Sequence, residues 1–220
     1  MTAWIAQYWW LAPLVIVAGA IPLSRYLERK RRETYEAFCL SRGFTFEVAR
    51  PGGETHYATV CPLFAKGHGR TWGYTLGGRW SSRPFTAFEY RYTTGGGKNS
   101  QTHRLAMILW ENAEATLPRF SVTPEGFWDR LAQRFGRQDF DFVEDPEFSA
   151  AYQLQGDDEA AIRRLFAPDV RRRLVATPGQ HAAGGGRHLL WWRVGKLPKP
   201  DDLDTFFAEG DGVRQLFVER

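Results

Sequence analysis

The side chains best suited to bind or transform a ligand gather between residues 85 and 110. Tyr90, Tyr92 and His103 bring two phenol hydroxyls and an imidazole, which donate and accept hydrogen bonds, and the imidazole also exchanges protons near neutral pH. Period-two alternation places Tyr90 and Tyr92 on one face of a strand and His103 on the apolar face of the next. These three residues form a candidate ligand site. The alternative for His103 is a structural histidine paired with a tyrosine hydroxyl or a backbone group.

The glycine-rich segment GGGKNS at 95–100 has some features of a phosphate-binding loop. That loop also needs Gly where Tyr92 stands and Ser or Thr where Asn99 stands, and a helix must follow it. Here a strand pattern follows. We therefore interpret the segment as the flexible tip of a hairpin and assign no nucleotide to it.

Metal and catalytic motifs are absent from the sequence. The five histidines include no pair at helical i, i+4 spacing. Asp139 and Asp141 fall on one face of an expected strand and could hold a divalent cation, but the calcium-loop pattern is missing, so solvated edge and helix-cap carboxylates are the preferred interpretation. We assign no catalytic, cofactor-binding or metal-ligating residue and expect no cofactor.

An apolar stretch runs from Ala3 to Leu23, with Gln7 as its only strongly polar side chain. As a helix it is about 30 Å long, which matches the hydrocarbon core of a bilayer. Aromatic rings suited to one membrane interface stand at its N-terminal end, and basic residues follow its other end. The expected membrane-interface residues are Trp4, Tyr8, Trp9, Trp10, Arg25, Arg29, Lys30, Arg31 and Arg32.

The positive charge is concentrated beside this stretch. The net charge is +4, and residues 24–33 hold five Lys or Arg against two Glu. A basic nucleic-acid-binding surface is therefore not expected. The positive-inside rule keeps the basic block in the cytoplasm, with the N-terminus outside. A second set of basic residues could bind anionic lipid headgroups or form an ordinary solvated face. These residues are Arg163, Arg164, Arg171, Arg172, Arg173, Lys196 and Lys199.

Strand patterns come first along the chain, and helices become frequent after residue 123. Two strands are expected at 72–79 and 85–93, joined across Gly77-Gly78 and 81–84, and the second forms a hairpin over 85–110. The other expected strands are 44–48, 117–122, 139–143, 152–155 and the hairpin 181–194. The expected helices are 24–41, one starting with Thr123 as N-cap and Pro124 as its first residue, 157–166, 169–176, and 201–217 with an interruption near Gly210 and Gly212.

This order predicts an α+β fold: an N-terminal transmembrane helix, then a cytoplasmic domain with a largely antiparallel sheet and flanking helices. The predicted division is 1–23 anchor, 24–42 basic juxtamembrane helix and 43–220 cytoplasmic domain, with a possible sub-boundary near 123.

Four segments stand out together with the apolar stretch: FEYRYTTGGGKNSQTHR (88–104), LPRFSVTPEGFWDRL (117–131), QDFDFVEDPEFSAAYQLQGDDEAAIRRLF (138–166) and LERKRRE (27–33). In combination they resemble a family of bacterial membrane-anchored hypothetical proteins of unknown function. The likeness covers nearly the whole chain. It implies one inherited architecture with an anchor and carries over no catalytic residues.

The sequence thus predicts a single-pass protein of the cell inner membrane. Its two cysteines fit a reducing compartment. We expect a non-enzymatic cytoplasmic interaction module whose partners are the lipid bilayer and a membrane protein or anionic lipid headgroups, with no nucleic acid. The alternative is a small-ligand receptor or enzyme with its site near the 85–110 hairpin, which would show a concave site containing His103.

Overall fold

The computed structural model describes residues 12–48, 57–58, 60–111, 116–127 and 138–218. The chain divides into two compact units, Met1–Gly43 and Phe44–Arg220.

The first unit is described as one long helix, α2 (Ala12–Arg42), which contains Pro22. The expected helix over 24–41 lies within it. Ion pairs one turn apart join Arg29 to Glu33 at 2.8 Å and Arg32 to Glu36 at 2.6 Å. These pairs are exposed, so each contributes only a few tenths of a kcal/mol, about 0.3–0.5. In the part of the chain that the structure describes, no helix is long and apolar enough to cross a membrane. Residues 1–11, with Trp4, Tyr8, Trp9 and Trp10, lie outside it.

The second unit is built on one nine-stranded sheet in the described residues, in the order β1-β2-β3-β4-β9-β8-β5-β7-β6. All neighbouring strands are antiparallel. The α+β class and the antiparallel sheet are therefore confirmed. The strands are β1 (Thr45–Glu47), β2 (His68–Trp80), β3 (Arg83–Thr94), β4 (Gln101–Glu111), β5 (Leu117–Pro124), β6 (Gln138–Asp139), β7 (Tyr152–Gly156), β8 (His181–Gly186) and β9 (His188–Val194).

Strands β3 and β4 form the expected hairpin, paired from Phe85↔Trp110 to Thr94↔Gln101. Its tip contains the short 3₁₀ helix η4 (Gly97–Asn99). Gly95 has a φ of 73°, and a Cβ there would collide with the Asn99 carbonyl oxygen. Only glycine therefore fits this turn without strain. A strand follows the tip, which excludes the helix that a phosphate-binding loop requires.

Of the expected connection across Gly77-Gly78 and 81–84, the part at Ser81-Ser82 is confirmed, whereas Gly77 and Gly78 lie inside β2. The turn between β2 and β3 consists of Ser81 and Ser82, whose φ angles are 48° and 65°. Positive φ at both central residues is the geometry of a two-residue hairpin turn. Packing requires glycine at position 78, because a Cβ there would collide with the ring of Phe44.

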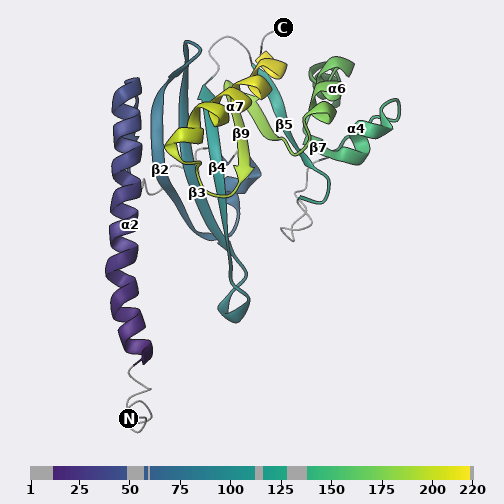
Figure 1. Cartoon of the computed structure of the whole chain (residues 1–220). Coiled ribbons are helices and arrows are strands. Elements are labelled where there is room, and N and C mark those ends of the chain that lie inside the picture. Colours follow the sequence, from purple (N-terminus) through teal and green to yellow (C-terminus); the bar gives the residue numbers. More distant parts are fainter. Residues whose placement is uncertain (1–11, 49–56, 59, 112–115, 128–137, 219–220) are drawn as a thin grey trace, which may run out of the picture. The chain divides into compact units, whose positions relative to one another are not determined.

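The helix α7 (Leu203–Val218), preceded by η5 (Pro200–Asp202), crosses one face of the sheet, here called the helix face (Figure 1). The expected interruption near Gly210 is wrong, because α7 continues through it. A Cβ at Gly210 would lie 2.8 Å from Trp191 and 2.9 Å from both Ile108 and Trp110. The glycine lets the helix backbone lie directly on three large side chains of the sheet.

The opposite face, here called the cavity face, carries an aromatic cluster. Trp72 stacks on Phe88 with 3.7 Å between ring centroids, and Phe64 contacts both rings. Phe64 belongs to η3 (Pro62–Ala65), whose Pro62, Leu63 and Phe64 are buried. Aromatic pairs of this kind contribute about 0.5–1.5 kcal/mol beyond area burial, so η3 is firmly attached to this face.

Three short helices, α4 (Pro146–Ala151), α5 (Glu159–Leu165) and α6 (Pro168–Ala176), accompany β5 and β7 at the other end of the sheet (Figure 1). They confirm the helices expected near 157–166 and 169–176, whereas α4 was not expected. Asp145 caps α4 by accepting from the Phe148 N–H, and its carboxylate lies 2.8 Å from Arg171. This pair fixes α4 to α6.

Two further expectations in this region need correction. Thr123 and Pro124 do not begin a helix, because both belong to β5 and pair with Gln153 and Tyr152. The expected strand at 139–143 is regular only as far as Asp139. Beyond it, the Phe142 N–H donates to the Ser149 hydroxyl at 2.9 Å, so the chain turns into α4 instead of continuing the sheet.

Replacing Gly210 with Ala should lower the free energy of unfolding by about 1–3 kcal/mol, because the added methyl overpacks the helix face. The matched control is Gly212→Ala in the same helix, where a Cβ meets nothing within 4 Å. That change should raise stability by about 0.5–1 kcal/mol through helix propensity. Denaturant unfolding of the two full-length variants measures the difference, and equal effects would contradict the close helix–sheet contact.

Candidate functional site

The candidate site lies where the hairpin extends beyond its neighbour in the sheet. Strand β4 begins at Gln101, but its pairing with β9 begins only at Leu105↔Val194. The chain leaves the sheet at Gly195, whose N–H donates to the Arg104 carbonyl at 2.8 Å. Gly195 has a φ of 126°, which favours glycine at this turn. The residues of β4 before Leu105 therefore extend past the end of β9, and this offset between the two strands is here called the step.

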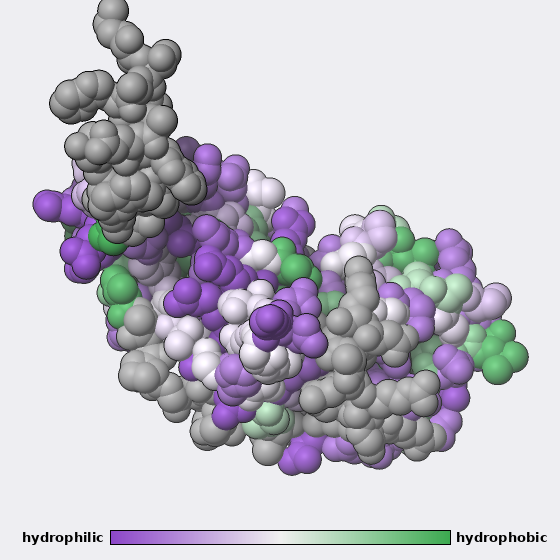
Figure 2. Space-filling view, turned by 90° about the horizontal axis from the view of Figure 1, so that it is seen from below, coloured by the Kyte–Doolittle hydropathy of each residue, from purple (hydrophilic) through white to green (hydrophobic). Residues whose placement is uncertain are grey.

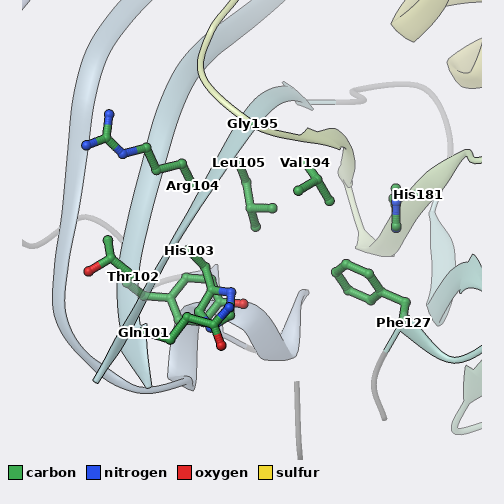
Figure 3. A pocket seen from close by; sticks show the side chains of 10 residues that line it. Gln101, Thr102, His103, Arg104, Leu105, Phe127, His181, Val194 and Gly195 are labelled. Atoms are coloured by element: carbon green, nitrogen blue, oxygen red, sulfur yellow. The ribbon is translucent and has the colours of Figure 1, made fainter. Parts of the chain in front are cut away.

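A cavity of about 580 Å³ occupies this step. Figure 3 shows His103 on one side, His181 and Phe127 on the other, and Leu105 and Val194 between them. The lining residues are Tyr92, Gln101, Thr102, His103, Arg104, Leu105, Phe127, His181, Val194 and Gly195. Cavities of about 300–1,000 Å³ with apolar walls and a few polar groups are typical ligand sites.

His103 is fixed by two neighbours. Its Nε2 lies 2.8 Å from the Thr94 hydroxyl, and its ring stacks on Tyr92 with centroids 4.9 Å apart. Burial, and then the charge of Lys66, lower the pKa of His103 below its ordinary value of 6.5. The imidazole is therefore neutral at pH 7 and offers one donor and one acceptor nitrogen.

Lys66 and Tyr92 belong to the same buried group. Lys66 follows η3 and is 2% exposed, and burial lowers its pKa to about 8. Burial, and then the neighbouring Cys61, raise the pKa of the Tyr92 phenol above its usual range. The Tyr92 hydroxyl is buried without a hydrogen-bond partner among the described residues. An unsatisfied buried polar group of this kind costs about 1–3 kcal/mol of stability.

The far wall is aromatic. His181 is the first residue of β8 and is 6% exposed. Its ring centroid lies 4.5 Å from that of Phe127 and 5.4 Å from that of Trp192, and the His181 ring stacks on the Trp192 ring. Val194, at the mouth, is 68% exposed. The cavity thus combines flat rings at its sides with aliphatic side chains at its entrance.

No carboxylate is among the lining residues in the described part of the chain. Arg104 points away from the cavity in Figure 3, toward Glu89, whose carboxylate lies 3.9 Å from its guanidinium. Glu89 also accepts from the Leu197 N–H at 3.3 Å. A histidine oriented by an acid, as general base catalysis usually employs, is therefore not formed by the described lining residues. The arrangement is suited to binding.

Of the three candidate residues, Tyr92 and His103 line the cavity. Tyr90 lies deeper, fully buried, where its hydroxyl donates to the Leu63 carbonyl at 3.3 Å. The sequence reasoning missed His181, Phe127 and Lys66. No local motif marks them, since they come from segments that only the folded sheet brings to His103.

The other charged candidates lie elsewhere. Asp145 and Arg171 form the pair described above, where the Arg171 hydrogen bond holds the pKa of Asp145 below its usual range. Arg163 pairs with Glu159 at 2.8 Å. Arg25, Arg29, Lys30 and Arg32 are exposed on α2, whereas Arg31 is half-buried. Among the described residues, no three His, Cys, Asp or Glu side chains are grouped as a metal site would require.

Comparison with protein-family models, with curated proteins and with solved structures found no match.

The NMR titration of the His103 ring should give a pKa below 6.5, and Lys66→Met should raise it because the neighbouring positive charge is removed. Lys98→Met, at the exposed hairpin tip, is the matched control and should leave it unchanged. The unfolded chain takes up this proton more readily than the folded one, so stability should fall as pH falls below 6.5. A His103 pKa at or above 6.5 would contradict the buried placement.

Proposed function

We propose that the protein is a non-enzymatic small-ligand receptor held at the cell inner membrane by its N-terminal segment. The observation that carries the ligand-binding part is the cavity on the step between β4 and β9, with Tyr92 and two histidines among its lining residues. The cavity is large enough for a molecule of drug size. It favours the receptor alternative over an interaction module that binds only a protein surface.

The surface of the second unit also favours a cavity ligand. Its large exposed hydrophobic side chains among the described residues are Val48, Val143 and Val194. In the view of Figure 2, hydrophilic residues cover most of the coloured surface, and hydrophobic ones form small separate patches. Protein-binding faces usually present a larger continuous apolar area. Val194 differs from the other two valines in lining a cavity.

The proposed membrane association rests on the first unit. The apolar stretch Ala3–Leu23 has the length of a bilayer span. Beyond it, α2 exposes apolar side chains together with basic ones, a combination suited to the headgroup region. The exposed apolar residues here are Ile21, Leu23, Tyr26 and Leu27. Anionic lipid headgroups, or a membrane-protein partner, would contact this segment, and the second unit would lie in the cytoplasm.

Val194→Trp should abolish ligand binding, because the indole would fill the mouth of the cavity. The measurement is mass spectrometry of small molecules released from the full-length protein after purification from its native membranes. A compound carried by the wild type should be absent from the variant. Since Val194 is 68% exposed, stability should change by less than about 0.5 kcal/mol.

The matched control is Val143→Trp, a second exposed valine, which does not line the cavity. It should retain the compound. If the wild type releases nothing specific, or if both variants release the same compounds, the cavity is not a receptor site.

Deleting residues 1–23 should move the chain from the membrane fraction to the soluble fraction. In the full-length protein, a fluorescent protein fused to the C-terminus should fluoresce and a phosphatase fused there should be inactive, because the basic block keeps that side in the cytoplasm. Changing Arg25, Arg29, Lys30, Arg31 and Arg32 to Gln should weaken this preference. An active phosphatase fusion to the unchanged sequence would overturn the orientation.

A further inference from the structure

We infer that the cavity binds an aromatic monocarboxylate, with the ring held between its aromatic and aliphatic walls and the carboxylate directed to the hydrogen-bond donors beside His103. This inference rests on the proposed receptor function and adds the chemical class of the ligand. The shape of the walls, the donor set and the local charge each support it.

The walls select an apolar, flat molecule. Phe127 and His181 present rings on one side, and Tyr92 with His103 presents a stacked pair on the other. Aromatic rings prefer to pack on other rings in stacked or edge-on arrangements about 4.5–7 Å apart. A planar aromatic group would pack against the rings of either side.

The polar groups of the lining favour a ligand that brings acceptors. The neutral His103 imidazole carries one N–H and can donate it to an acceptor. The side-chain amide of Gln101, on the same face of β4 as His103, adds a further donor. Carboxylate oxygens accept several such bonds at once, and bonds to a charged group are about twice as strong as neutral ones.

The local charge favours an anion over a cation. The described lining contains no carboxylate to pair with a cationic ligand. Lys66 is buried, and after burial its charge is the second cause that lowers the pKa of His103. Because two like charges repel in a buried site, a ligand amine beside His103 would meet the same repulsion. A ligand carboxylate would be attracted instead.

The test compares three probes of the same ring on the full-length protein in lipid nanodiscs: 1-naphthoate, the neutral 1-naphthamide and the cationic 1-naphthylmethylamine. The expected result is that 1-naphthoate binds at least about tenfold more tightly than the amide, a difference of about 1.4 kcal/mol, with the amine weakest. Val194→Trp should abolish binding, and Val143→Trp should not.

A separate variant tests the contribution of the Lys66 charge. Lys66→Met should reduce the preference for naphthoate over naphthamide while the amide still binds, and Lys98→Met should leave the preference intact. Equal affinities for acid and amide, or a preference for the amine, would overturn the inference while the cavity remains a ligand site. If none of the probes binds in a way that Val194→Trp removes, the aromatic class is wrong. The receptor function is then decided separately by the compounds released from native membranes.

Discussion

The structure depends on one constraint: the central strands β3, β4 and β9 are covered on both faces. A shift of one residue in strand pairing moves every side chain to the opposite face of the sheet. Here α7 occupies the helix face, and η3 with the aromatic cluster occupies the cavity face. Each side chain is therefore committed to one of two different packing environments. The register that places Ile108 and Trp110 against α7 also places Leu105 and His103 at the cavity.

The cavity follows from the unequal lengths of these strands. The hairpin continues past the last β4–β9 pair, so its end lacks a neighbouring strand on that side, and the turn at Gly195 closes the step. Beside this step Tyr92 and Lys66 are buried and His103 is half-buried. This is why His103, Lys66 and Tyr92 all have pKa values shifted toward their neutral forms. Burial of the Tyr92 hydroxyl and of the Lys66 ammonium therefore costs stability.

Period-two alternation is local, and for that reason it predicted the β3–β4 hairpin, while the order of strand and helix patterns along the chain predicted the α+β class. Where the sequence reasoning failed, a distant contact had replaced the local signal. Thr123-Pro124 has the form of a helix start, but pairing with β7 keeps it extended. Gly210 is a helix breaker in isolation, yet it is the point where α7 touches Trp191. Lys66 and His181 have no recognisable pattern, because their relation to His103 exists only after the sheet has formed.

The proposed ligand class and the proposed anchor support each other physically. An aromatic carboxylate is amphipathic, so it concentrates at a membrane surface, with its ring among the upper acyl chains and its charge in water. Anionic headgroups oppose that accumulation, but the basic residues that follow the apolar stretch offset the negative surface potential within about 10 Å. A receptor tethered there samples a higher local concentration than one free in the cytoplasm. For the proposed site, a modest affinity would then be sufficient for occupancy.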